Sequence, residues 1–98
     1  MVRVILRHKV ADYGRWKEAF DGHLGARKAA GEVGCRVMLS VEDPREVTVF
    51  LDWDSLDRAR KFAASDDLKQ RMLQSGVIGD PDVRFLEDAY TVRRSSAD

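Results

Sequence analysis

The sequence predicts an α+β domain whose strands and helices follow the order β-α-β-β-α-β. Four segments alternate apolar and polar residues with a period of two, and two longer segments repeat apolar residues every three or four positions. Right-handed connections turn this order into a four-stranded antiparallel sheet with two helices on one face. The expected fold is therefore ferredoxin-like.

The first strand and the first helix are predicted from the N-terminal third of the chain. Val2 to Val10 alternate as a strand with one buried face does. Asp12 stands where a helix N-cap is expected, and apolar residues then recur at helical spacing until Gly31. We expect one long amphipathic helix between these two residues.

A β-hairpin is expected next. Alternation returns over residues 33–41 and again over 47–53, with Asp43 and Pro44 as turn residues between the two runs. Cys35 lies in the first of these strands and is expected to be a buried, inert thiol, because strand cores often hold cysteine.

The second helix and the last strand complete the pattern. Apolar residues at helical spacing predict a helix over 56–73, interrupted near Ser65, which can cap a new helical start. Residues 76–81 are rich in Gly, Asp and Pro and predict a loop, and residues 83–92 predict the last strand.

Length and charge limit the classes of function. The 98 residues suffice for one domain, expected over 1–92, with a flexible tail over 93–98. Seventeen Lys and Arg balance seventeen Asp and Glu, which argues against nucleic-acid and membrane-surface partners. The sequence has no signal-peptide core and no stretch of about 20 apolar residues, so we expect a cytoplasmic protein without a membrane span.

The sheet face opposite the helices is expected to form an interface. It mixes Ile5, Met38 and Phe50 with charged residues, so it is too apolar to be left bare and too charged to be a core. We predict a homodimer through this face. An RNA-recognition module would use the same face, but the acidic residues and the missing RNA-stacking aromatic pattern weigh against it.

Few residues have the types and spacing that chemistry needs. The sequence contains no nucleotide-binding, zinc-protease or nucleophile-elbow motif. His8 and His23 lie on different predicted elements without a carboxylate at ligand spacing, so no metal site is predicted. The suggestive feature is a stripe of Trp16, Phe20, His23 and Arg27, which lie four, three and four residues apart on one helical face.

This stripe has a structural and a functional interpretation. In the structural one, Trp16 and Phe20 belong to the core, His23 lies at its boundary and Arg27 at the surface. In the functional one, the stripe lines a pocket in which His23 is the general acid or base and Arg27 holds an anionic oxygen. Trp16, Phe20 and Tyr13 would then be the walls that bind substrate.

His8 also has a functional and a structural interpretation. It lies on the helix-facing side of the first strand and could share a cavity wall with Tyr13 and Trp16. A hydrogen-bonded histidine at the edge of the core is the favoured interpretation, because buried polar groups usually have partners.

The order of these residues resembles the dimeric α/β-barrel superfamily, in particular the antibiotic biosynthesis monooxygenases. The likeness rests on the runs from His8 to His23, Val47 to Trp53 and Leu56 to Ser65, followed by Gly76 and Val77. It implies a homodimer with sheets packed face to face and a cavity between the helices and the sheet of each subunit. Members include cofactor-independent oxygenases of aromatic polyketides and quinols, polyketide cyclases and haem-degrading enzymes.

From this resemblance we expect a cofactor-independent monooxygenase or cyclase that acts on a small hydrophobic or aromatic molecule, with no cofactor and no metal. The alternative is a non-catalytic ligand-binding or stress-related protein of the same fold. The chain contains no asparagine, a residue that several oxygenases and haem-degrading members use in their cavities.

Overall fold

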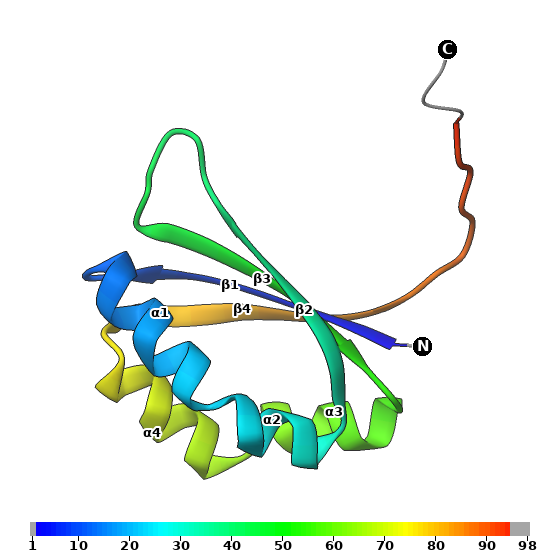
Figure 1. Cartoon of the computed structure of the whole chain (residues 1–98), viewed down its shortest axis with the longest axis horizontal. Helices are drawn as coiled ribbons and strands as arrows, with labels where there is room; N and C mark the ends of the chain where they lie inside the picture. The colour runs from blue at the N-terminus through cyan, green and yellow to red at the C-terminus, as the bar shows by residue number, and fades with distance from the viewer. Residues whose placement is uncertain (1, 95–98) are drawn as a thin grey trace.

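The computed structural model describes residues 2–94 and shows one sheet with helices packed on one of its faces (Figure 1). The strand order is β2-β3-β1-β4, and all neighbouring strands are antiparallel. The predicted α+β, ferredoxin-like fold is confirmed. In chain order the elements are β1 (Val2–Val10), α1 (Tyr13–Gly22), α2 (Leu24–Ala30), β2 (Glu32–Leu39), β3 (Glu46–Trp53), α3 (Leu56–Ala63), α4 (Asp66–Gln74) and β4 (Val77–Glu87).

The prediction of one long first helix is wrong, because the helix breaks at His23. This residue ends α1 and caps the start of α2. Its N–H donates to the carbonyl oxygen of Phe20, three residues back, at 3.1 Å, a tightened turn that does not continue the α-helical ladder. Gly22, a poor helix former, precedes the break. The start was predicted correctly, since Asp12 Oδ2 accepts from the N–H of Arg15 at 2.9 Å.

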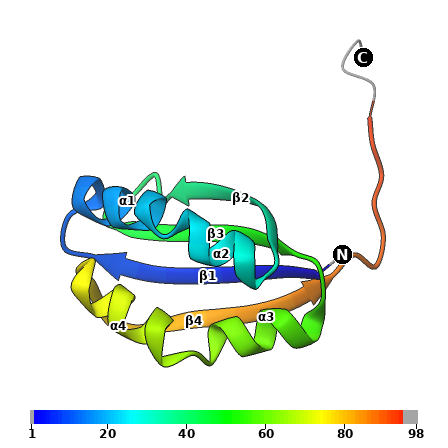
Figure 2. The same ribbon diagram turned by 60° about the horizontal axis from the view of Figure 1, so that its bottom comes forward.

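The second helical segment is interrupted as predicted. Ser55 caps α3 by accepting from the N–H of Arg58, and Ser65 caps α4 by accepting from the N–H of Leu68. The α1–α2 pair and the α3–α4 pair run side by side across the same face of the sheet (Figure 2). None of the helices in the described residues is long and apolar enough to cross a membrane.

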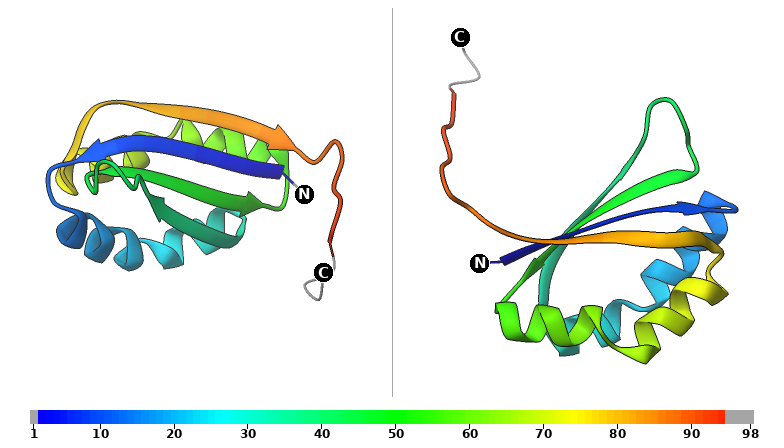
Figure 3. Two further views of the ribbon diagram at one scale, coloured as in Figure 1. Left: turned by 90° about the horizontal axis from the view of Figure 1, so that it is seen from above. Right: turned by 180° about the vertical axis from the view of Figure 1, so that it is seen from behind.

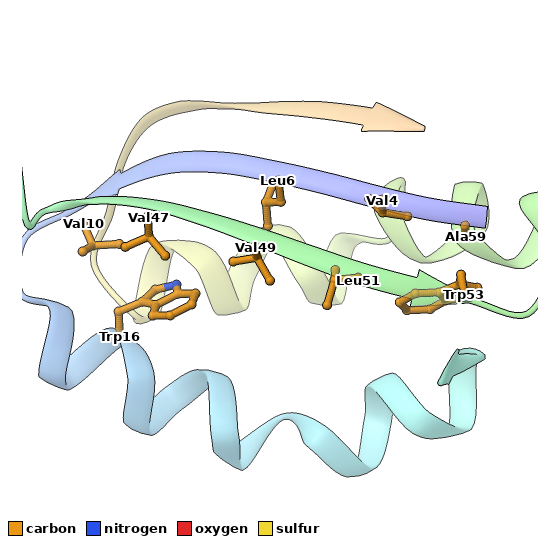
Figure 4. Close-up of a cluster of buried hydrophobic side chains, with 9 residues drawn as sticks. All are labelled: Val4, Leu6, Val10, Trp16, Val47, Val49, Leu51, Trp53 and Ala59. Atoms are coloured by element: carbon orange, nitrogen blue, oxygen red, sulfur yellow. The ribbon is translucent and has the colours of Figure 1, made fainter. Parts of the chain in front are cut away.

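The core lies between this helical layer and the sheet (Figure 4). Trp53 is its largest fully buried side chain, and its indole Nε1 donates to the carbonyl oxygen of Ala30 at 3.1 Å. The indole N–H therefore has a partner, and the ring fills the end of the core beside α2. The other buried apolar residues are Val2, Val4, Leu6, Val10, Trp16, Val47, Val49, Leu51 and Ala59.

The expectation that Cys35 is buried is wrong. Its strand partner is Leu51, a helix-facing core residue, so the predicted face is correct. However, β2 is an edge strand, and Cys35 is exposed there. The strand also ends at Leu39, so Val41, predicted as part of it, lies outside and is fully exposed.

The last strand begins and ends earlier than predicted. β4 already pairs at Val77, and the predicted loop residues 79–81 form an irregularity opposite β1, where Gly79 has a φ of +73°. Tyr90 and Val92, predicted as strand, lie in a segment without regular structure that leaves the domain (Figure 1). The predicted domain boundary stays a prediction, and residues 95–98 of the predicted tail lie outside the described residues.

No helix among residues 2–94 packs on the opposite face of the sheet (Figure 3). Ile5 and Phe50 are neighbours on adjacent strands there and are half-buried, while Met38 is half-exposed. Charged residues surround them in pairs, with Arg3 Nε 3.0 Å from Asp52 Oδ1. The mixture of apolar and charged side chains expected on this face is present.

Candidate functional site

A cavity of about 280 Å³ lies between the helices and the sheet. Its floor comes from β1 and β3, and its sides come from both helical pairs. The exposed residues Ala19, Gly22 and Gln74 form its lip, between α1 and α4. The remaining lining residues are Leu6, His8, Trp16, Phe20, His23, Arg27, Leu51, Phe62, Leu68, Arg71, Met72 and Ser75.

Aromatic rings form one wall of this cavity. The rings of Trp16 and Phe20 stack with centroids 4.9 Å apart and planes 19° apart. Tyr13 stacks on Trp16 at 6.0 Å but does not itself line the cavity, although it was predicted as a wall residue. Four of the five predicted site residues therefore line one cavity, and Tyr13 packs against the Trp16 ring outside it.

His23 lies at the junction of α1 and α2 with its side chain inside the cavity. It is 6% exposed, so it is not the boundary residue of the structural interpretation. Its Nε2 lies 3.3 Å from Oδ2 of Asp67, which also accepts from Nε of Arg71 at 3.2 Å. The pKa of His23 is lowered mainly by burial and by the charge of Arg71, and the Asp67 carboxylate opposes this effect only in part. The ring is therefore neutral at pH 7.

Asp67 also influences which nitrogen of His23 carries the proton. When the carboxylate accepts from Nε2–H, the lone pair is on Nδ1, and a proton taken up there gives an imidazolium that the carboxylate stabilises. A neutral buried imidazole next to a carboxylate has the properties of a general base.

Arg27 lines the cavity, as in the functional interpretation, but its guanidinium already has partners within the chain. It is 3% exposed, so it is not a surface residue, and its Nε donates to Oε1 of the buried Glu32 at 2.7 Å. Its Nη1 donates to the carbonyl oxygen of Phe20, and its Cζ lies 3.7 Å from the centre of the Phe20 ring. The guanidinium thus joins α1, α2 and β2, and its binding of a ligand anion stays a prediction.

Asp67 and Arg71 are site residues that sequence reasoning missed. They lie one turn apart on α4 with side chains about half or more exposed. From sequence they look like an ordinary surface pair at i and i+4. Only tertiary packing of α4 brings Asp67 to His23, and Arg71 lines the cavity together with Arg27.

His8 is the polar residue on the floor of the cavity. It is 4% exposed, and neither ring nitrogen has a hydrogen-bond partner in residues 2–94. Its ring packs against Trp16 with centroids 5.5 Å apart. The expectation of a hydrogen-bonded histidine is therefore wrong, and the unmet hydrogen bonds cost about 1–3 kcal/mol.

His8 should make the protein less stable in mild acid. Burial lowers its pKa to about 4, from about 6.5 in the unfolded chain, so the unfolded chain binds the extra proton between these values. Protonation of His8 does not lower the free energy of unfolding above pH 6.5, and it lowers it by up to about 3 kcal/mol as the pH approaches 4. Urea unfolding of His8→Leu should show a flatter profile over this range. A profile parallel to that of the wild type would contradict the assignment.

Within the described residues, no three His, Cys, Asp or Glu side chains lie close enough together to hold a metal ion. The polar side chains that line the cavity are instead two imidazoles, two guanidinium groups, one amide and one hydroxyl, and the Asp67 carboxylate lies beside His23. Such a set suits hydrogen bonding and proton transfer to an organic molecule.

Comparison of the sequence with protein-family models and with curated proteins gives no match. The structure, by contrast, is similar to many solved ones. A crystal structure described as an antibiotic biosynthesis monooxygenase is similar with a TM-score of 0.69 and 9% identity, covering 92% of this chain and 100% of the other.

Two further solved structures show the same likeness. Rv0793 from Mycobacterium tuberculosis has a TM-score of 0.68 and 15% identity, covering 94% of this chain and 98% of its own. SnoaB from Streptomyces nogalater, described as a cofactor-independent oxygenase, has a TM-score of 0.64 and 13% identity, covering 99% and 97%. The chain therefore has the same fold as these three solved structures.

Proposed function

We propose that this protein is a small-molecule enzyme of the cofactor-independent monooxygenase or cyclase kind, acting on a hydrophobic or aromatic substrate. The observation that carries the proposal is His23, a buried and neutral imidazole beside Asp67 in an aromatic-walled cavity. The fold shared with a described cofactor-independent oxygenase supports the reaction class.

In this proposal His23 removes a proton from an acidic O–H or C–H group of the bound substrate. The proton stays on the imidazole, where Asp67 stabilises the positive charge. The substrate anion is delocalised over its aromatic rings, and Arg71 lies at the cavity to stabilise it. In a cyclase the carbanion attacks a carbonyl carbon of the same molecule, the C=O π bond opens to an alkoxide, and this oxygen takes the proton from the His23 imidazolium, so no oxidant is needed.

In an oxygenase the same substrate anion reacts with dioxygen instead of a carbonyl carbon. Electrons pass from the substrate anion to dioxygen, one oxygen atom enters the substrate, and the other leaves as water. The protein's part is to form the anion and to shield it from solvent, which the walls of Trp16 and Phe20 support.

Anthrone is a suitable first probe, because its C–H is weakly acidic and its oxidation to anthraquinone changes the absorbance. Oxygen uptake and anthraquinone formation should exceed the rate without protein and saturate with anthrone concentration. Binding of anthrone and related phenols without any turnover would contradict the enzyme proposal.

That result would instead support a non-catalytic protein that binds a small apolar ligand. One observation favours this second candidate. Arg27, predicted to hold an anionic oxygen, is engaged by Glu32 and by Phe20. Arg71, the other guanidinium at the cavity, is half-exposed and paired with Asp67, so solvent and this carboxylate weaken its attraction for a ligand anion.

The rate of the reaction should fall at low pH, because a protonated His23 cannot accept a proton. The pKa of His23 is lowered, so the midpoint of the acid limb of kcat/KM should lie below pH 6.5. Steady-state rates between pH 4.5 and 8 check this expectation. A rate that rises with acidity over this range would assign the catalytic role to a protonated group instead.

We also infer that two copies associate through the bare face of the sheet. Its centre is apolar at Ile5, Phe50 and Met38, and a hollow of about 230 Å³ beside Phe50 offers space for a side chain of the second copy. Burial of such a face contributes roughly 25 cal/mol per Å² of apolar area. The charge pairs around the centre can remain at the rim of the interface.

Phe50→Lys should weaken this dimer, because it places a charge at the centre of the apolar patch. Sedimentation at micromolar concentration should show dimers for the wild type and a shift to monomer for the variant. Leu73→Lys is the matched control, since Leu73 is a highly exposed apolar residue of α4 on the helical side. A monomeric wild type, or equal effects of the two substitutions, would contradict the interface.

A further inference from the structure

A groove with a volume of about 540 Å³ lies between α2 and α3, two helices that run beside each other on the same face of the sheet (Figure 2). Ala26, Ala29 and Ala30 form its α2 wall. These short side chains do not fill the space between the helices, and Ala26 and Ala29 are exposed. The groove is therefore open to solvent along its length.

The α2–α3 groove begins where the aromatic cavity ends. His23 and Phe62 line both of them, with ring centroids 6.2 Å apart, and Asp67, the neighbour of His23, lines the groove. Gly22, at the lip of the cavity, directly precedes His23. A chain attached to a ligand in the cavity can therefore leave at the lip and enter the groove from the solvent side of His23.

The α3 wall of the groove carries two cations, three residues apart. Arg58 has partners within the chain, because it pairs with Asp54 and its Nη2 donates to the carbonyl oxygen of Ala29 at 2.7 Å. It thus joins α3 to α2. Lys61 is exposed and forms no ion pair with any side chain of residues 2–94. Its ammonium group is available to a ligand.

The other polar side chains of the groove are already engaged. Asp67 is the one acidic side chain among residues 2–94 that lines it, and its carboxylate lies 3.2 Å from Nε of Arg71 and 3.3 Å from Nε2 of His23. The hydroxyl of Ser65 caps α4. The groove therefore offers an apolar wall and one unpaired cation, Lys61, which suits an acidic group at the end of an apolar chain.

We propose that the α2–α3 groove binds an acidic side chain of the substrate, with its carboxylate paired to Lys61 and its methylene groups against the alanines of α2. The aromatic part of the same molecule lies in the cavity against Trp16 and Phe20. The cavity alone, at about 280 Å³, is at the small end for a ligand site. This inference rests on the proposed function, because the aromatic part must occupy the cavity.

Two pairs of naphthalene probes test the inference. The long pair is 4-(2-naphthyl)butanoate and its uncharged amide, and the short pair is 2-naphthoate and 2-naphthamide, which have no chain to enter the groove. NMR titration at pH 7 and low salt gives the dissociation constants. The wild type should bind the butanoate about fivefold more tightly than its amide, the upper end for an exposed ion pair. Salt at about 0.5 M should reduce this preference.

Lys61→Gln removes the cation from an exposed position where little structure depends on it. The preference for the butanoate over its amide should fall to near one in this variant, and the ratio of the short pair should stay as in the wild type. Lys69→Gln is the matched control, since Lys69 is an exposed lysine of α4 that lines neither the cavity nor the groove. It should leave both ratios unchanged.

Ala26→Leu tests the position of the chain without changing any charge. Leucine is a good helix former, so α2 should persist, and its larger side chain occupies the groove. Both long probes should bind several-fold more weakly to this variant, whereas the short probes should bind as they do to the wild type. An equal loss for the long and the short probes would place the chain outside the groove and overturn the inference.

The outcomes separate this inference from the function on which it rests. If the preference for the butanoate survives in Lys61→Gln, or falls equally in Lys69→Gln, the role of the groove is overturned while the proposed function stands. If no probe binds to the wild type, the groove inference is overturned as well. Anthrone turnover, which needs only the cavity, then decides separately whether the proposed function falls with it.

Discussion

Replacing His23 by glutamine should lower kcat by about 10²- to 10⁴-fold, the range for loss of a general base. Glutamine keeps a polar side chain of similar size but cannot take up a proton near pH 7. Substrate binding should change little, because the aromatic wall of Trp16 and Phe20 is intact. The measurement is steady-state turnover of anthrone together with its dissociation constant in both proteins.

Asp67→Asn is the companion variant. It keeps a side chain of the same shape next to Nε2 of His23 but removes the charge that stabilises the imidazolium. We expect a smaller loss of kcat than in His23→Gln, and a pKa of His23 that falls further. Near-normal turnover by His23→Gln would remove His23 from the mechanism, whatever the effect of Asp67→Asn.

The fold could be predicted from sequence because its signals are local and repeated. The period of two along β1 and β3, the cap at Asp12 and the second cap at Ser65 each depend on a few adjacent residues. Boundaries were less reliable where tertiary pairing decides them. β4 begins at Val77 because that residue pairs with Val10 across the sheet, which no local pattern of Gly, Asp and Pro reveals.

The site could be predicted in part. The spacing of Trp16, Phe20 and His23 indicated a shared face, and those residues do line one cavity. The break at His23 depends on one tightened turn, and helical spacing alone continued the helix through it. Glu32 and Asp67 were missed because their partners, Arg27 and His23, lie on other elements.

Cys35 and His8 show that the face of a strand residue can be predicted where its burial and its hydrogen bonds cannot. Both lie on the predicted face of their strands, since the period of two fixes the face. The face alone does not fix burial at an edge strand, so Cys35 is exposed. Nor does it supply a hydrogen-bond partner, so His8 has none among residues 2–94.

Arg27→Leu should destabilise the protein by about 3–5 kcal/mol, because it leaves the carboxylate of Glu32 buried without its partner. The substitution also removes the hydrogen bond to the Phe20 carbonyl and the contact with the Phe20 ring. Urea unfolding at pH 7 gives the free energy difference. Lys17→Ala is the matched control, since it breaks an exposed ion pair with Asp21 on α1 and should change the free energy of unfolding far less.

The double variant Arg27→Leu, Glu32→Leu separates the buried charge from the packing. Replacing both partners of a buried ion pair by apolar residues is often close to neutral, so the double variant should recover much of the stability that Arg27→Leu loses. If Arg27→Leu does not fold, Arg27→Lys keeps the charge without the planar guanidinium and should lose less. A loss in Arg27→Leu no larger than in Lys17→Ala would show that Glu32 finds another partner.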